Sequence, residues 1–180
     1  MRKRRFAPTL FFALMGALSA IVWAQTAVAP ANPRTVLESR FEEALGQPVA
    51  TTIAGTQSVN DTGFNLKVFA SDRPVVVFYY QDDADSRGLA FLYKYLMLKY
   101  AGRIKFLAFQ VNESNPSGPD RASQVIDKYS LKELPSLAFY KIREGKMTRV
   151  DTMDGGFHSF EFFLKNMQIF DLFIPKSILD

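Results

Sequence analysis

The chain has 180 residues, 48% of them hydrophobic, with no cysteine and a single histidine, His158. Its formal net charge of +4 is accounted for by the four basic residues at positions 2–5, since 22 Lys and Arg stand against 18 Asp and Glu. The rest of the chain is therefore close to neutral, which excludes the basic stripe that nucleic-acid binding needs. The absence of thiols excludes thiol–disulfide exchange, and one histidine excludes a His-rich metal cluster.

The N-terminal residues predict an export signal. Residues 2–5 are basic, residues 6–23 are mostly apolar, and a small-residue cleavage motif ends at Ala24, which is the order found in secretory signal peptides. We assign residues 1–24 to a signal peptide and expect a periplasmic or otherwise exported protein. The apolar run of about 18 residues is near the length that spans a bilayer, so an uncleaved inner-membrane anchor is the alternative. Membrane contact is expected only through this segment.

Helix and strand patterns follow in chain order. After a linker, Asn32 and Pro33 start a helix that Gly46 ends, and residues 25–49 form this linker and added helix. A continuous apolar run at 74–79 predicts a strand that is buried on both faces. The pattern then predicts a helix, a buried strand, a helix, a hairpin and a last helix: 86–100, 104–111, 121–129, 136–142 with 147–153, and from Phe157.

Three local motifs accompany this order of elements. Residues 78–87 read Phe-Tyr-Tyr-Gln-Asp-Asp-Ala-Asp-Ser-Arg, residues 134–136 read Leu-Pro-Ser, and residues 155–156 are both glycine. They resemble the strand-to-helix junction, the cis-proline motif and the glycine before the last helix of the thioredoxin-like superfamily. The resemblance implies an α/β fold over residues 50–170, in which a central mixed sheet is built from βαβ and then ββα, with helices on both faces. The N-terminal helix and a tail, residues 171–180, are additions to it.

The resemblance also implies that the active-site positions of the family lack the residues that carry out its redox reaction. Asp83 and Ser86 stand at the two cysteine positions of the family's CxxC motif, while Val77 and Ala108 stand where the family has a buried aspartate and lysine. Neither a carboxylate nor a hydroxyl can attack a disulfide or resolve a mixed disulfide. We therefore expect an exported, redox-inactive member of the superfamily that is not an enzyme and has no cofactor and no metal.

Binding is the function that the resemblance favours. In thioredoxin-like domains the cis-proline loop offers backbone hydrogen bonds to an extended partner segment, which is a form of strand addition and needs no cysteine. We therefore expect a protein or peptide partner, in a chaperone-like or assembly role. The expected recognition face comprises six residues: Tyr79, Tyr80, Asp82, Leu134, Pro135 and Ser136.

The acidic loop at the start of the helix supports two interpretations. Asp82, Asp83 and Asp85 can satisfy free backbone N–H groups and interact favourably with the helix dipole. Closely spaced acids also suit calcium or magnesium, so a cysteine-free metal binder or enzyme is an alternative function.

The Phe-rich C-terminal region supports a further alternative. Its helix and tail are apolar on more than one side. The tail is expected to pack against the added helix at Leu37, Phe41 and Leu45, or else to form the surface of a structural or scaffold subunit.

Overall fold

The structure is a computed structural model and describes residues 32–111 and 121–180. The predicted signal peptide, most of the linker and residues 112–120 lie outside the described residues. The sheet and the helices packed on it lie within Leu37–Asp180. Among the described residues, no helix has both the length and the apolar character needed to cross a membrane. The elements are α1 (Pro33–Leu45), α2 (Val49–Thr52), β1 (Gln57–Ser58), η2 (Asn65–Phe69), β2 (Val75–Tyr80), α3 (Ala84–Lys99), β3 (Lys105–Gln110), α4 (Arg121–Tyr129), β4 (Ser136–Arg143), β5 (Lys146–Asp154), α5 (Phe160–Phe173) and η3 (Ile174–Leu179).

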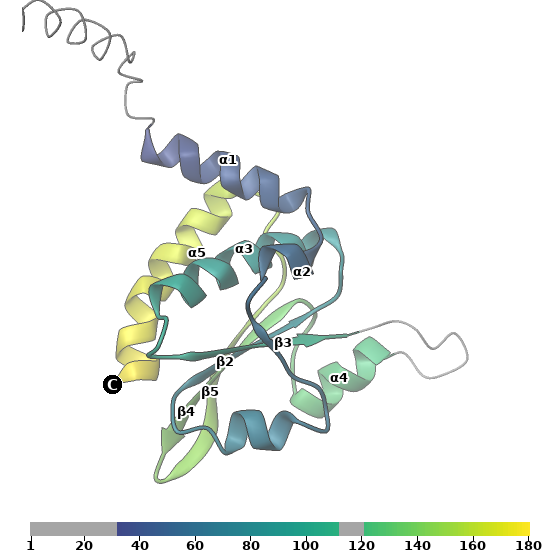
Figure 1. The fold of residues 1–180 in the computed structure, drawn as a ribbon, viewed down its shortest axis with the longest axis vertical. Coiled ribbons are helices and arrows are strands. Elements are labelled where there is room, and N and C mark those ends of the chain that lie inside the picture. The colour runs from purple at the N-terminus through teal and green to yellow at the C-terminus, as the bar shows by residue number, and fades with distance from the viewer. Residues whose placement is uncertain (1–31, 112–120) are drawn as a thin grey trace, which may run out of the picture. The chain divides into compact units, whose positions relative to one another are not determined.

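The strands form one mixed sheet with the order β1-β3-β2-β4-β5 (Figure 1). Strands β1 and β2 pair in parallel with β3, whereas β4 pairs antiparallel with both β2 and β5. A parallel βαβ unit is thus followed by an antiparallel hairpin and a last helix. The expected thioredoxin-like α/β arrangement is confirmed.

Strand β2 lies at the centre of two hydrophobic cores, and all six of its residues are buried. Val76, Phe78 and Tyr80 face α3, α5 and η3, while the alternate residues face η2 and α4. Burial on both faces explains why the strand has a continuous apolar run instead of alternating apolar and polar residues.

Local N-cap residues determine where α3 and α5 begin. Asp83 caps α3, which therefore begins at Ala84, two residues earlier than expected. The N-cap of α5 is Ser159, whose side chain accepts a hydrogen bond from the N–H of Phe162 at 3.3 Å. This helix begins three residues later than expected, because Phe157 is buried in the core instead of entering the helix.

The β4–β5 hairpin turns at Glu144 and Gly145, which both have positive φ, 51° and 74°. A two-residue turn whose twist matches that of the strands requires positive φ at both of its central residues. The register pairs Phe139 with Asp151 but Tyr140 with Arg149, so Val150 is an extra residue that forms a β-bulge.

The added N-terminal helix and the C-terminal tail pack at different places. Phe41 of α1 stacks on Phe163, with ring centroids 5.4 Å apart, near the start of α5. The segment η3 instead packs along β4, and its Ile174 and Ile178 are buried. The tail therefore does not pack against α1 as expected, because α5 runs between them and separates the tail from that helix (Figure 1).

Candidate functional site

The two positions that would carry thiols stabilise the start of α3. The Asp83 carboxylate accepts a hydrogen bond from the N–H of Ser86 at 2.7 Å. Ser86 is fully buried, and its hydroxyl accepts a hydrogen bond from the N–H of Gln81 at 3.2 Å. Since the chain has no cysteine, it holds no group that could form a mixed disulfide here.

The other two acids of this loop have separate partners. Asp82 accepts a hydrogen bond from the N–H of Val49, the first residue of α2, at 3.0 Å, and the same oxygen lies 3.9 Å from Nε of Arg87. Asp85 lies 3.3 Å from Nδ1 of His158. The carboxylates are thus directed at different groups, whereas a cation needs several oxygens that converge on one point. Within residues 32–111 and 121–180, no three acidic or histidine side chains are arranged to hold a metal ion.

The segment before α5 covers this junction through direct backbone contact. A Cβ atom added to Gly88 would lie 1.9 Å from the carbonyl oxygen of Phe157, and one added to Gly156 would lie 2.6 Å from Cα of Asp85. Glycine is therefore required on both sides of the contact. The contacts at Asp85 and Gly88 lie on both sides of Ser86 in the sequence, the position where the second thiol of a CxxC pair would lie.

Tyr79 and Tyr80 do not line a surface. Tyr79 is fully buried with its hydroxyl 3.4 Å from that of Tyr140, and burial raises the pKa of Tyr79 well above its ordinary value. Tyr80 is 5% exposed and stacks on Phe78, with ring centroids 5.0 Å apart. The expectation that both tyrosines contribute to a recognition face is wrong, because helices cover both faces of β2.

The cis-proline motif is partly accessible. The Leu134–Pro135 peptide bond is cis, and Pro135 and Ser136 are buried. The carbonyl of Pro135 accepts a hydrogen bond from the N–H of Gly155 at 2.8 Å. Leu134 is half-buried, and its own backbone N–H and C=O have no hydrogen-bond partner among the described residues.

Leu134 lies beside the acidic loop. The antiparallel register pairs Tyr79 with Ser136, so Leu134 reaches the end of the sheet where β2 enters that loop. Asp82 is also accessible, with 47% of its side chain exposed. Of the six expected recognition residues, Leu134 and Asp82 are therefore the two that a partner can reach.

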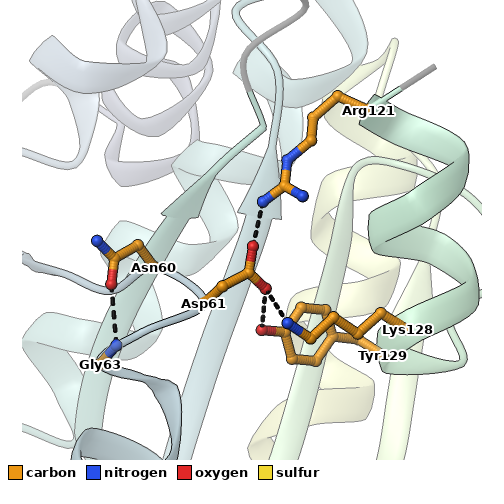
Figure 2. A network of polar contacts seen from close by, with 6 residues as sticks. All are labelled: Asn60, Asp61, Gly63, Arg121, Lys128 and Tyr129. Carbon is orange, nitrogen blue, oxygen red and sulfur yellow. Dashed lines mark hydrogen bonds and ion pairs between the residues drawn. The ribbon is translucent and has the colours of Figure 1, made fainter. Parts of the chain in front are cut away.

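A second polar cluster, which the sequence did not indicate, is shown in Figure 2. It lies on the face of the sheet opposite α3 and α5. Asp61 accepts hydrogen bonds from Arg121, from Nζ of Lys128 at 2.6 Å and from the hydroxyl of Tyr129 at 2.7 Å. Partial burial of the carboxyl opposes ionisation, but these three donors outweigh it and hold the pKa of Asp61 well below its usual range. The cluster ties the chain before η2 to both ends of α4.

A pocket of about 560 Å³ adjoins this cluster and lies between η2, the end of α4 and the β4–β5 hairpin. No spacing rule connects Asp61 with Lys128 and Tyr129, which are 67 and 68 residues away.

Comparisons with known proteins find likeness in structure. No family model and no curated protein matches the chain. The chain is similar to part of the crystal structure of full-length ERdj5, with 15% sequence identity and a TM-score of 0.49 over 68% of this chain. It spans 16% of that protein's length. The class of the protein follows from its own sheet order and its own α3 junction: a cysteine-free α/β protein with the thioredoxin-like arrangement.

Proposed function

We propose that this chain is a redox-inactive thioredoxin-like protein that binds an extended protein or peptide segment at the Leu134 loop. The observation that carries the proposal is that Leu134 is half-buried and that its N–H and C=O have no partner among the described residues. Such a donor and acceptor next to the end of a sheet can pair with an extended chain, which is recognition by strand addition.

The charge around this backbone favours a basic partner segment. Asp82 and Asp83 are exposed in the loop that follows β2, and Glu133 is exposed directly before Leu134. Backbone pairing would supply affinity, whereas these carboxylates would select a Lys or Arg side chain in the bound segment. The buried tyrosines have no part in this form of the proposal.

Peptide selection followed by amide chemical-shift mapping tests the proposal. A displayed library of random peptides is selected on the purified chain, and an enriched peptide is titrated into the 15N-labelled protein. We expect the largest shifts at Leu134, Ser136 and Gly155. Leu134→Pro removes the backbone donor and leaves its acceptor in the bound peptide unpaired, a loss of about 1–3 kcal/mol, so it should weaken binding at least about fivefold. The matched control Leu134→Ala retains that donor and should bind within about threefold of the parent.

Two outcomes would contradict the proposal. One is the failure of the selection to enrich any peptide above background. The other is a set of shifts centred on Phe162, Ile169 and Leu172, the side chains that are about half or more exposed on α5. That second result would support the scaffold alternative, in which the C-terminal helix is the working surface. Most of the phenylalanines in this region are unavailable for such a role, since four of them are buried: Phe157, Phe160, Phe163 and Phe170.

We further propose that binding takes place outside the cytoplasm, in the periplasm or an equivalent exported compartment. The basic residues 2–5 and the apolar residues 6–23 support this. Cell fractionation with N-terminal sequencing tests it, because a chain beginning at Gln25 in the exported fraction is expected and an unprocessed chain in the cytoplasm would contradict it.

A further inference from the structure

The pocket beside Asp61 has the size and the mixed lining of a small-molecule site. Its volume of about 560 Å³ falls in the range of about 300–1,000 Å³ that is common for ligand pockets. Aromatic side chains of η2 and β4 form the apolar part of its lining, and basic residues of α4 and β5 form the polar part. The pocket lies on the sheet face opposite α3 and α5, and Leu134 is not among the residues that line it.

The β-bulge at Val150 directs two side chains into this pocket. Met153 packs in the core beneath α5, and strict alternation along β5 would place Met147 and Arg149 on that same face. The extra residue reverses the alternation, so that Arg149 pairs with Tyr140 and both line the pocket together with Met147. Bulges that redirect side chains are common next to binding sites.

The polar part of the lining is positively charged. Lys128 and Arg149 line it with a single carboxylate, that of Asp61, which already accepts hydrogen bonds from Lys128 and from Arg121, a residue outside the lining. Arg149 is anchored, because its Nη1 donates to the carbonyls of Tyr129 and Ser130 at the end of α4. Its Nε and Nη2 make no hydrogen bond within the described part of the chain and remain available to an anion, which a planar guanidinium can bind through two donors.

The apolar part of the lining has an exposed aromatic residue. Phe69 is 49% exposed, and its ring centroid lies 5.6 Å from that of Phe64 and 6.1 Å from that of Tyr140. These three rings are spaced as aromatic pairs are. Phe64 and Tyr140 are each 3% exposed, so Phe69 presents most of the aromatic surface to a flat apolar body. Burial of the exposed part of Phe69 would favour binding through the hydrophobic effect.

We propose that this pocket binds a small amphipathic anion, in which an aromatic body carries one acidic group. The body lies against Phe64, Phe69 and Tyr140, and the acidic group faces Arg149 and Lys128. The proposal is independent of peptide binding at Leu134, since the two sites share no residue.

Two fluorescent probes that differ in one charge test the proposal on the full chain. Anilinonaphthalene sulfonate carries the anion on an aromatic body, and N-phenyl-1-naphthylamine has the same body without the anion. We expect the sulfonate to bind at one site per chain and at least tenfold more tightly than the neutral probe. In protein labelled with 13C at its methionine methyl groups, the sulfonate should shift the Met147 signal and leave that of Met97, which does not line the pocket, unchanged.

Four variants locate the binding site. Phe69→Ala and Arg149→Gln should each weaken sulfonate binding at least tenfold, and Arg149→Lys should restore part of the loss. Leu98→Ala is the matched control for probe binding to exposed apolar surface, since Leu98 is 66% exposed and lies on α3, and it should bind as the parent does. Urea unfolding of each variant shows whether it is folded. If Arg149→Gln does not fold, Phe69→Ala and the methionine spectra still decide the test.

Equal affinity for the two probes would overturn the proposal, as would binding of several probes per chain, an unshifted Met147 signal, or unchanged sulfonate binding in Phe69→Ala.

Discussion

Asp61 shows how one carboxylate can organise several donors that are far away in the sequence. Its three partners, Arg121, Lys128 and Tyr129, come from both ends of α4. Since 28% of the Asp61 side chain is exposed, solvent screens the ion pairs in part. The hydrogen bonds to the partly buried carboxylate should therefore provide most of the stabilisation.

Asp61→Asn is expected to lower the free energy of unfolding by about 1–3 kcal/mol, the usual range for hydrogen bonds to a charged group. Urea unfolding at pH 7 measures this. Asp72→Asn is the control, because Asp72 pairs with Arg73 at 3.8 Å but is 92% exposed, and it should change stability by less than about 0.5 kcal/mol. Equal effects of the two substitutions would contradict the role of the cluster.

The same cluster predicts a pH dependence with a definite sign. The pKa of Asp61 is lowered in the folded state, so its contribution is fully present above the unfolded pKa of about 3.9 and is lost as the pH falls below that value. The stability difference between the parent and Asp61→Asn should therefore be constant from pH 7 to pH 5 and should decrease from pH 4 downward. A difference that grows on acidification would contradict this.

At the scale of elements, the contact between α3 and the segment before α5 is the closest in the junction. Gly88 and Phe157 meet with no room for a Cβ atom. Asp83 caps the start of α3 in the same junction, and Ser86 is fully buried there, so the junction is a packed structural feature where an exposed, reactive pair of thiols would otherwise lie.

Gly88→Ala is expected to destabilise the protein by about 1–3 kcal/mol or more, because the added methyl group overlaps the Phe157 carbonyl and forces the backbone apart. Gly46→Ala is the matched control: its nearest added contact is 3.4 Å, to the carbonyl oxygen of Glu43. Urea unfolding of both variants is the measurement, and equal stability would show that the segment before α5 can move away at little cost.

At the scale of the whole molecule, the two hydrophobic cores share one sheet. Ile178 of η3 is buried on one face and Val125 of α4 on the other. Strands β2, β3 and β4 contribute alternate residues to both cores. If either core opened, the apolar side chains on that face of these strands would therefore be exposed to solvent.

Unfolding of the protein should therefore be a single cooperative transition. Ile178→Ala should lower the free energy of unfolding by about 2–5 kcal/mol, and Val125→Ala should shift the midpoint of the same transition. Tyrosine fluorescence and far-ultraviolet circular dichroism, followed in urea, should coincide for both variants. Separate midpoints for the two signals would mean that the cores unfold independently.

Local patterns predict much of this architecture. The apolar run of β2, the Glu144–Gly145 turn and the bounds of α4 follow from the character of adjacent residues. The bulge at Val150 does not, since an extra residue in β5 is defined only by the partner strand.

The candidate sites were harder to predict for two physical reasons. An aromatic residue that ends a strand has the same sequence pattern whether it lines a groove or fills a core, and Tyr79 and Tyr80 fill cores. Asp61 finds its partners only when the sheet brings α4 beside it, so nothing near Asp61 in the sequence marks the cluster or the pocket.

The Val150 bulge also affects how the molecule behaves in a crowded solution. Strand β5 is at one margin of the sheet, so its outer row of amide and carbonyl groups could pair with a strand of another molecule. The extra residue breaks the regular spacing of that row near its middle, and Lys146, Asp151 and Asp154 place charges along it. The residue that turns Arg149 toward the pocket therefore also protects this margin against aggregation.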